Sequence, residues 1–195
     1  MTIPNSPAVA HASSAPSPWI ARWSHLLPPG CEVLDVACGS GRHLQWFASR
    51  GHPVLGVDQN VDAARVLVPA AQLVQADIEN GPWPLVSAEG PRKFGAVVVT
   101  NYLWRPLLPV LLQSLEPGGL LLYETFAAGN ESVGRPARPD FLLQPGELLR
   151  VCADLQVVAY ENGFLDSPDR FLQRVAAFAP ALPVPTGTAI SRHPL

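Results

Sequence analysis

"VLDVACGSGRH" occupies residues Val33 to His43 and is the most informative stretch of this chain. Its first five residues form an apolar run that alternates too little for a half-exposed strand, which predicts a strand buried on both faces. Gly39 and Gly41 then allow a sharp turn and bring backbone N–H groups close to whatever lies beyond the strand end. The stretch therefore predicts a buried strand, a tight turn and a helix that begins near Arg42.

The length and charge of the chain limit its function classes. A chain of 195 residues is expected to form one domain with a sizeable core, because single cores rarely grow beyond roughly 250 residues. The net charge of −3 gives no basic excess of the kind that nucleic acid or anionic membranes attract. We therefore expect neither a nucleic-acid partner nor a membrane partner, and the sequence indicates no particular oligomeric state.

The cysteines indicate a reducing compartment. Cys31, Cys38 and Cys152 lie far apart and form no C-x-x-C pair, so we expect reduced, mostly buried thiols in a cytoplasmic protein. No disulfide and no metal site is expected. No apolar stretch approaches the roughly 20 residues of a membrane helix, and the first residues lack the charged start and apolar centre of a signal peptide.

Two tails flank the expected domain. Residues 1–17 and the proline-rich residues 180–195 are predicted to be disordered, which leaves a folded domain over 18–179. Within it, apolar runs alternate with helical patterns. Expected helices cover 18–27 (with Ser17 as the cap), 42–50, 61–68, 105–115 and 145–153. Expected strands cover 32–37, 53–58, 72–77, 94–101, 120–126, 155–164 and 170–179.

This alternation predicts an α/β fold. Strands separated by helices imply right-handed crossovers and a doubly wound, mostly parallel sheet with helices on both faces. The last two strands are joined by a short turn and are expected to form an antiparallel hairpin at one edge. Residues 78–93 contain too many Pro and Gly residues for a regular helix and are expected to be a loop.

Polar or small residues stand where four of the expected strands end: Gly39, Asp58, Asp77 and Asn101. Ligands of such sheets bind at the carboxyl ends of the strands, where the strand order reverses. A carboxylate at position 58 can accept hydrogen bonds from both hydroxyls of a ribose, and Asp77 can accept one from the exocyclic amine of a purine. Each aspartate alone can equally cap the next helix, but together with the glycine turn they favour a cofactor that carries a nucleoside.

A dinucleotide is the first candidate cofactor, and the sequence disfavours it. Its turn should read G-x-G-x-x-G, with the third glycine packing the helix against the strand. Here the span is "GSGRHL", so Leu44 stands at the third glycine. The chain also has little room for a separate substrate domain.

Four motifs together resemble the class I S-adenosylmethionine-dependent methyltransferases. "DVACGSG" matches their first motif, "GVDQN" is similar to their acidic ribose-binding loop, "QADI" to their adenine-binding segment and "LEPGGLLLYE" to a later motif with a Pro-Gly-Gly turn. A narrower resemblance, to tellurite-resistance-type small-molecule methyltransferases, rests on "CGSGRHLQWFASRGHPVLGVD" and "YETFAAGNESVGRP".

The resemblance implies a Rossmann-like, seven-stranded sheet in the order 3-2-1-4-5-7-6 and S-adenosyl-L-methionine as the cofactor. It implies that the cofactor contacts are made by residues at the strand ends and in the turn after the first strand. These are Asp35, Ala37, Gly39, Gly41, Asp58, Gln59, Asp77, Ile78 and Asn101.

The acceptor side is less defined by the sequence. Methyl transfer from a sulfonium is an in-line displacement on an activated donor, so the protein mainly aligns the acceptor and excludes water. A general base is needed only for a weakly acidic, protonated acceptor. No catalytic residue is assigned, and the candidates are Tyr102, Arg105 and Glu124 near the strand ends.

Three further expectations concern the surroundings of the site. The loop over 125–144 is long for a compact domain and is predicted to order over the acceptor. The first helix, with Trp19 and Trp23, is expected near the cofactor, where Arg22 can meet the cofactor's carboxylate or remain solvated. Arg42 and His43 open a helix and are expected to be solvated.

The predicted function is methyl transfer to a small-molecule acceptor. Two alternatives remain: a non-catalytic S-adenosylmethionine-binding protein, and a methyltransferase acting on RNA or protein. The acidic balance of the chain and the lack of an accessory domain argue against the last of these.

Overall fold

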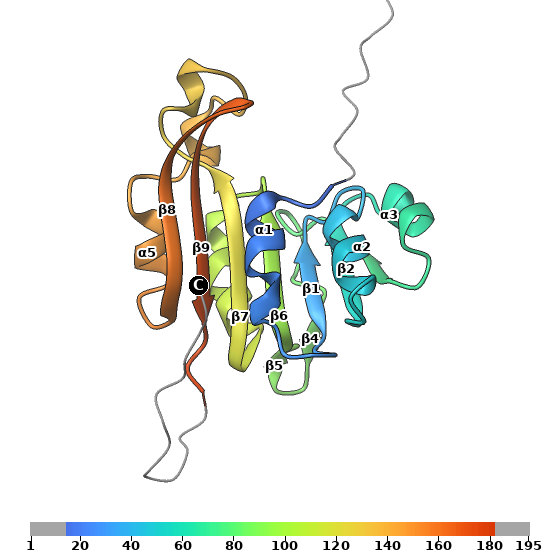
Figure 1. Cartoon of the computed structure of the whole chain (residues 1–195). Helices are drawn as coiled ribbons and strands as arrows, with labels where there is room; N and C mark the ends of the chain where they lie inside the picture. The colour runs from blue at the N-terminus through green and yellow to red at the C-terminus, as the bar shows by residue number, and fades with distance from the viewer. Residues whose placement is uncertain (1–14, 182–195) are drawn as a thin grey trace, which may run out of the picture.

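A seven-stranded sheet with helices on both faces forms the centre of the computed structural model, which describes residues 15–181 (Figure 1). The strand order is β3-β2-β1-β6-β7-β9-β8. Since β6, β7, β8 and β9 are the fourth to seventh long strands, this is the expected order 3-2-1-4-5-7-6, and the predicted fold class is confirmed. The predicted disordered tails lie outside the described residues, except for 15–17 and 180–181.

The bounds of the elements follow the expected alternation. The strands are β1 Val33–Val36, β2 Val54–Asp58, β3 Gln72–Gln75, β4 Val86–Ser87, β5 Gly90–Pro91, β6 Phe94–Thr100, β7 Leu115–Phe126, β8 Gln156–Asp166 and β9 Asp169–Phe178. The α-helices are α1 Pro18–Trp23, α2 Arg42–Ala48, α3 Asp62–Leu67, α4 Leu108–Gln113 and α5 Glu147–Val151. Short 3-10 helices are η1 Ser24–Leu26, η2 Arg105–Leu107, η3 Asn130–Ser132 and η4 Pro139–Phe141.

Strand β1 lies in the middle of the parallel part of the sheet, between β2 and β6. All four of its residues are buried, because α-helices cover the sheet on both faces. Its neighbours are registered so that Asp35 lies opposite Gly56 on one side and Val98 on the other. This pairing brings the ends of β1, β2 and β6 to one edge of the sheet.

Two hydrophobic cores lie on opposite faces of the sheet, because successive strand residues point to opposite sides. Leu34 and Val36 of β1 belong to the core under α4 and α5. Val33 belongs to the other core, which also holds Trp19 and Phe47 from α1 and α2. Figure 1 shows α1 and α2 on one face of the sheet and α5 on the other.

Helix α1 begins at the predicted cap. The Ser17 Oγ accepts a hydrogen bond from the Trp19 N–H at 3.1 Å, and Trp19 and Trp23 are both buried. Their rings meet edge to face with centroids 5.6 Å apart, and the Trp19 indole N–H donates to the Val175 carbonyl at 3.3 Å. The α-helix ends at Trp23 and continues as η1, so it is shorter than expected.

Two other segments differ from the expected elements. The loop over 78–93 contains a small hairpin, β4–β5. Strand β7 begins at Leu115 rather than at residue 120, because Leu115 already pairs with Phe94 and the next pair is Ala96 with Leu120. The residues between form a bulge, in which Gly118 has a φ of 76°.

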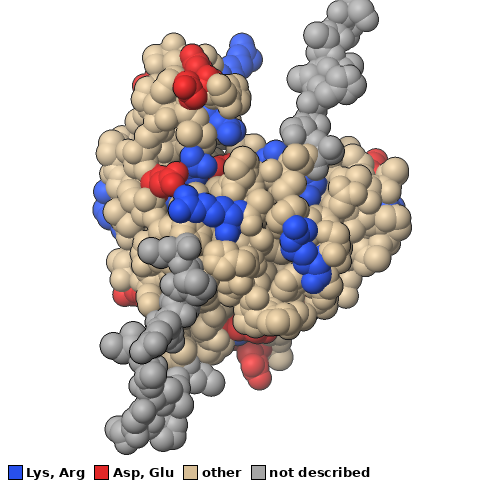
Figure 2. Space-filling model, viewed as in Figure 1, with Lys and Arg blue, Asp and Glu red and all other residues tan. Residues whose placement is uncertain are grey.

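Charged side chains of both signs occur on the face that α1 covers. Figure 2 shows Lys and Arg beside Asp and Glu on the left of this face rather than one continuous basic patch. The ion pairs of Arg174 fit this picture, because its guanidinium lies 3.2 Å from Glu124 and 3.1 Å from Glu161.

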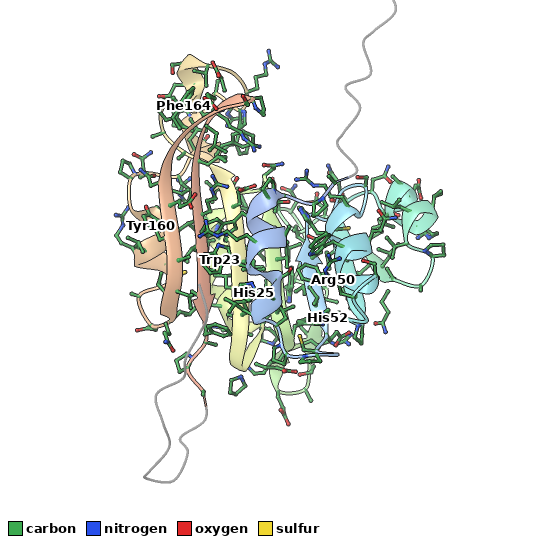
Figure 3. The ribbon with its side chains drawn as sticks, in the orientation of Figure 1. Trp23, His25, Arg50, His52, Tyr160 and Phe164 are labelled. Carbon is green, nitrogen blue, oxygen red and sulfur yellow. The ribbon has the colours of Figure 1, made fainter. Side chains whose placement is uncertain are left out.

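The β8–β9 hairpin extends well past the rest of the sheet. Figure 3 shows Phe164 close to its tip, beside the segment over 127–146. The Phe164 and Phe171 rings lie 5.0 Å apart, and the Asn130 amide oxygen accepts a hydrogen bond from the Phe171 N–H at 3.2 Å. The hairpin therefore supports the long loop that follows β7.

Candidate functional site

Three adjoining hollows lie at the carboxyl ends of the parallel strands. The first, of about 260 Å³, is lined among others by Ala37, Asp58, Gln59, Asp77 and Ile78. The second, of about 380 Å³, is lined among others by Ala37, Gly39, His43, Thr100 and Asn101. The third, of about 290 Å³, is lined by Asn101, Thr125, Phe126 and Phe141, among others. Tyr102 lines all three, so the hollows adjoin at this residue.

The turn after β1 shapes the first two hollows. Gly39 and Gly41 have φ angles of 53° and 84°, a conformation that L side chains rarely adopt. A Cβ atom on Gly41 would lie 3.1 Å from the Cβ of Ala64, whereas one on Gly39 would meet nothing within 4 Å. Gly41 thus permits α2 and α3 to pack closely, and Gly39 leaves space open in front of the turn.

Two non-glycine residues at the site share this left-handed conformation. Ala37, just after β1, has a φ of 53°, and Asn101, just after β6, has a φ of 54°. Backbone strain of this kind costs on the order of 1 kcal/mol or more and clusters at functional sites. Both residues line the second hollow. The sequence gives no signal for the strain at Ala37.

Asp58 fastens the turn to the end of β2. Its Oδ2 accepts a hydrogen bond from the Gly39 N–H at 2.8 Å, and its Oδ1 accepts one from the Asn60 N–H at 3.0 Å. Each carboxylate oxygen can accept a further hydrogen bond, and the side chain lines the first hollow. Asp58 is therefore still able to bind a pair of hydroxyl groups.

Asp77 is engaged with its own loop. Its carboxylate accepts hydrogen bonds from the Glu79 N–H, the Asn80 N–H and the Asn80 side-chain amide at 2.9 to 3.0 Å. The Asn80 side-chain hydrogen bond is the main reason that the pKa of Asp77 is lowered. These contacts close the turn after β3; the alternative of a helix cap does not apply here, because no helix lies between β3 and β6. Ile78 lines the first hollow beside it.

Asp35 and His43 are buried beneath the turn, so the solvated position expected for His43 is wrong. Both carboxylate oxygens of Asp35 lack a hydrogen-bond partner in the described part of the chain, and Oδ2 lies 3.9 Å from His43 Nδ1. Burial raises the pKa of Asp35 to about 8 despite the opposing charge of Arg42. Burial also lowers the pKa of His43 to about 3. At neutral pH both groups are therefore mostly uncharged.

His43 connects the start of α1 to the end of β6. Its Nε2 accepts a hydrogen bond from the Ser17 N–H at 3.1 Å, which assigns the ring proton to Nδ1. That Nδ1 lies 3.5 Å from Thr100 Oγ1. His43 points inward because its position in α2 faces the sheet. The sequence gives no signal for its contact with Ser17.

Tyr102 stands at the centre of the three hollows. Its carbonyl accepts a hydrogen bond from the Tyr123 hydroxyl at 2.9 Å, which fixes the backbone after β6. Its own hydroxyl is buried beside the Glu79 carboxylate and makes no well-formed hydrogen bond within residues 15–181. Burial, followed by the nearby Glu79 carboxylate, raises the pKa of Tyr102. The group is therefore a protonated hydroxyl that can donate to a bound molecule.

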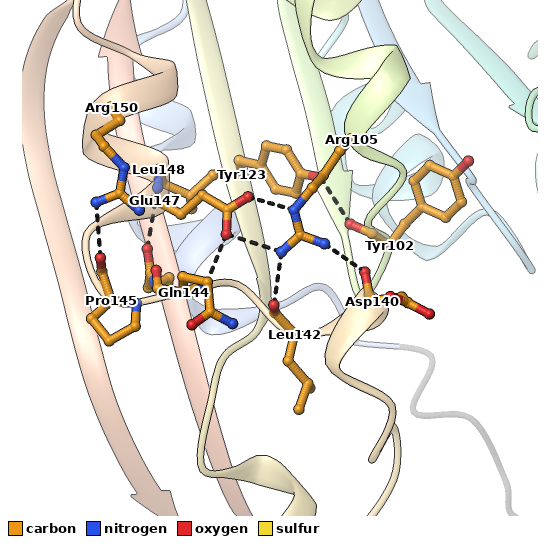
Figure 4. A network of polar contacts seen from close by, with 11 residues as sticks. Tyr102, Arg105, Tyr123, Asp140, Leu142, Gln144, Pro145, Glu147, Leu148 and Arg150 are labelled. Carbon is orange, nitrogen blue, oxygen red and sulfur yellow. Dashed lines mark hydrogen bonds and ion pairs between the residues drawn. The ribbon is translucent and has the colours of Figure 1, made fainter.

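Arg105 holds the long loop rather than the hollows, as Figure 4 shows. Its guanidinium makes a two-pronged contact with the Glu147 carboxylate at 2.7 and 3.0 Å. It also donates to the carbonyls of Asp140 and Leu142 at 2.7 and 2.9 Å. Burial alone would raise the pKa of Glu147, but the Arg105 contact, the hydrogen bond from the Gln144 N–H and the charge of Arg150 together lower that pKa. In Figure 4 the Tyr102 ring points away from this cluster.

Glu124, the third candidate, lies on the α1 side of the sheet and is 1 % exposed. It accepts a hydrogen bond from the Ser17 hydroxyl at 2.8 Å and pairs with Arg174 at 3.2 Å. It is not among the residues that line the three hollows. Arg22 lies 3.8 Å from Glu161 and is exposed, so it meets a carboxylate of the protein.

Other chemistries have little support in residues 15–181. No cluster of three or more His, Cys, Asp or Glu side chains there is arranged to bind a metal ion. In the same part of the chain, all helices are too short or too polar to cross a membrane. Cys31, Cys38 and Cys152 are free thiols.

Comparisons with known proteins agree with this geometry. A family model for a methyltransferase domain matches residues 33–119. Over 109 residues the chain is 34% identical to a malonyl-(acyl-carrier protein) O-methyltransferase of Serratia marcescens, an alignment that covers 52% of this chain and 41% of the relative. The chain spans less than half the length of the curated relatives it matches.

Solved structures match over most of the chain. TehB of Haemophilus influenzae superposes with a TM-score of 0.67 at 18% identity, over 87% of this chain and 64% of TehB. A 1,6-didemethyltoxoflavin-N1-methyltransferase of Burkholderia thailandensis, solved with S-adenosylhomocysteine, superposes with a TM-score of 0.61 at 16% identity, over 84% of this chain and 77% of that one. These superpositions agree with the sheet topology described above.

Proposed function

We propose that this chain is a class I S-adenosylmethionine-dependent methyltransferase and that it transfers a methyl group to a small-molecule acceptor. The observation that carries the proposal is the meeting of three hollows at Tyr102. Two of them suit the two ends of the cofactor, and the third lies beside both. A site with this arrangement can hold donor and acceptor at the same time.

The first hollow suits the adenosine. Asp58 offers carboxylate oxygens to the ribose hydroxyls, because each of them accepts only one hydrogen bond from the protein. Ile78 and Ala37 provide apolar surface for the base. Asp77 is held by Asn80 and Glu79, so we assign it mainly to shaping the loop beside the base.

The second hollow suits the amino-acid end of the cofactor. The open space in front of Gly39 admits a chain close to the backbone of the turn. Asn101 and Arg42 also line this hollow and offer an amide and a cation to the polar end. When bound, S-adenosylmethionine supplies an activated methyl group on a sulfonium.

The third hollow suits the acceptor. Asn101 and Tyr102 are shared between it and the second hollow, so an acceptor there lies next to the cofactor's reactive end. The chain's task is then to align the acceptor and exclude water. The Arg105 cluster contributes indirectly, because it fixes the loop that carries Phe141 and Pro136.

Two findings favour a small molecule over RNA or protein. The third hollow is a small pocket of about 290 Å³, and the α1 face of the molecule carries charges of both signs (Figure 2). The three free thiols fit a reducing compartment such as the cytoplasm.

The alternative of a cofactor-binding protein without activity predicts cofactor binding but no methyl transfer.

Cofactor binding is tested by calorimetry with S-adenosylhomocysteine and, separately, with NAD. The wild-type chain is expected to bind S-adenosylhomocysteine alone. Asp58→Asn should weaken this binding by about tenfold to a hundredfold, because hydrogen bonds to a charged group contribute about 1.5 to 3 kcal/mol. Asp62→Asn, at an exposed ion pair with Arg65, is the control and should bind as the wild type does. Equal affinities for all three chains, or binding of NAD instead, would refute the cofactor assignment.

Activity is tested with tritiated S-adenosylmethionine and a cell extract separated into small-molecule and macromolecular fractions. The proposal expects label in the small-molecule fraction only. Label in RNA or protein, or no transfer by a chain that binds S-adenosylhomocysteine, would favour one of the two alternatives.

A further inference from the structure

The walls of the third hollow are mostly aromatic and apolar. Tyr102, Phe126 and Phe141 contribute rings, and Leu103 and Pro136 contribute aliphatic surface. These residues come from the end of β6, the end of β7 and the following loop, so the rings surround one space from different elements. Such walls favour a planar, apolar ligand.

The polar groups of this hollow are Glu79, Asn101 and Thr125, and among the described residues no Lys or Arg lines it. Two nearby arginines are engaged elsewhere, and Arg135, which precedes Pro136 in the chain, is exposed and is not among the lining residues. Arg105 is held by Glu147 and two carbonyls, and Arg138 pairs with Asp140 at 2.8 Å. Within residues 15–181, the only charged side chain that lines the hollow is therefore a carboxylate.

Aromatic rings and a carboxylate together select for positive charge. A cation lying over aromatic faces is stabilised by their quadrupoles, and the Glu79 carboxylate adds a direct attraction. An anionic ligand would lose its hydration and meet Glu79 without a basic partner. The hollow thus discriminates between ligands by the sign of their charge.

We propose that the acceptor is a planar aromatic amine or nitrogen heterocycle without acidic groups, and that its nitrogen gains positive charge on methylation inside the third hollow. This inference rests on the proposed function and names its substrate class. It follows from the aromatic walls, the Glu79 carboxylate and the absence of basic side chains from the lining.

The charge balance of the reaction fits this hollow. The lone pair of the acceptor nitrogen forms the bond to the methyl carbon, while the electron pair of the carbon–sulfur bond stays with sulfur. The positive charge therefore moves from sulfur to nitrogen. A ring nitrogen without a proton remains a cation, whereas an amine nitrogen releases its proton to solvent at the mouth of the hollow, where Glu79 is exposed. The rings and Glu79 stabilise this charge as it develops.

The first experiment compares ligands of one shape and different charge. Calorimetry in saturating S-adenosylhomocysteine measures the affinities of N-methylisoquinolinium, 2-methylnaphthalene and 2-naphthoate. The expected order is cation first, neutral compound second and carboxylate last. Methyl transfer to isoquinoline but not to 2-naphthoate is the matching kinetic result.

The second experiment changes the charge of the hollow. Glu79→Gln should reduce the preference for N-methylisoquinolinium over 2-methylnaphthalene by about threefold to tenfold, the range of a partly exposed charge contact. Glu79→Lys should reverse the preference between the cation and 2-naphthoate. Glu89→Gln, in the distant β4–β5 hairpin, is the control and should leave all three affinities unchanged.

The outcomes separate this inference from the proposed function. If S-adenosylhomocysteine binds but 2-naphthoate binds as tightly as the cation, or Glu79→Gln leaves the preference unchanged, the substrate class is wrong and the methyltransferase assignment remains. If S-adenosylhomocysteine does not bind the wild-type chain, both are overturned.

Discussion

Replacing Asp35 with Asn is expected to remove a pH dependence of folding stability. Asp35 is 1 % exposed and its carboxylate has no hydrogen-bond partner, and burial raises its pKa from 3.8 to about 8. The folded chain therefore holds this proton more tightly than the unfolded chain does. Its contribution to stability is complete below about pH 4 and is lost as the pH rises towards 8.

The pKa shift of His43 makes stability depend on pH in the opposite direction, over a lower pH range. Burial lowers its pKa from 6.5 to about 3, so its contribution is complete above pH 6.5 and is lost as the pH falls. Between about pH 4 and 6.5 the slopes of Asp35 and His43 oppose each other. From pH 6.5 to 8, Asp35 is the one of these two groups that still changes stability, at up to about 1.4 kcal/mol per pH unit, which gives up to about 2 kcal/mol over this window.

Urea unfolding at pH 6.5, 7, 7.5 and 8 under reducing conditions measures this difference. The free energy of unfolding of the wild type should fall by up to about 2 kcal/mol across the window relative to that of Asp35→Asn. The test compares the slopes of the free energy of unfolding against pH, because the amide introduced at position 35 can shift this free energy by the same amount at every pH. Asp62→Asn, which alters an exposed carboxylate, should keep the wild-type slope. Parallel curves for the wild type and Asp35→Asn would refute the reasoning.

Two further substitutions test how the site is supported. Arg105→Gln removes the contacts with Glu147 and two loop carbonyls, so limited proteolysis within 127–146 should become faster and the free energy of unfolding should fall by about 1–3 kcal/mol. Arg138→Gln, at an exposed ion pair, is the control and should change neither quantity. Equal cleavage of both variants would contradict the role of Arg105 in holding the loop. In thermal unfolding, Gly41→Ala should destabilise the chain more than Gly39→Ala. Both substitutions add backbone strain of about 1–2 kcal/mol, but only a Cβ at residue 41 contacts Ala64. Equal losses would show that the structure adjusts to avoid the contact with Ala64.

The topology was predictable from the sequence because each long strand is a continuous apolar run. Val33–Val36 and Phe94–Thr100 are buried throughout, as expected for strands covered on both faces. The bulge before residue 120 was missed, because Pro117 and two glycines read as a break, although Leu115 already pairs with Phe94. Local residue preference does not show that a strand can resume its pairing after a bulge.

The site was predictable only where its residues stand at strand ends. Asp58, Asp77 and Gly39 converge because parallel strands end at one edge. Side-chain partners were not predictable: Arg105 is drawn to Glu147 and Glu124 to Arg174, both far away in the sequence. Glu79 was missed because it follows the strand end inside a loop, and its position depends on how that loop closes on Asp77.

The hydrogen bond between Asp58 and the Gly39 N–H bears on how a ligand is captured. Because this carboxylate secures the loop after β1 through a contact within the protein, the shape of the turn does not depend on a contact with the ligand. The protein backbone therefore loses little conformational entropy when a nucleoside binds, so a larger part of the contact energy contributes to the binding free energy. Encounter should thus resemble rigid docking, without an ordering step that slows association.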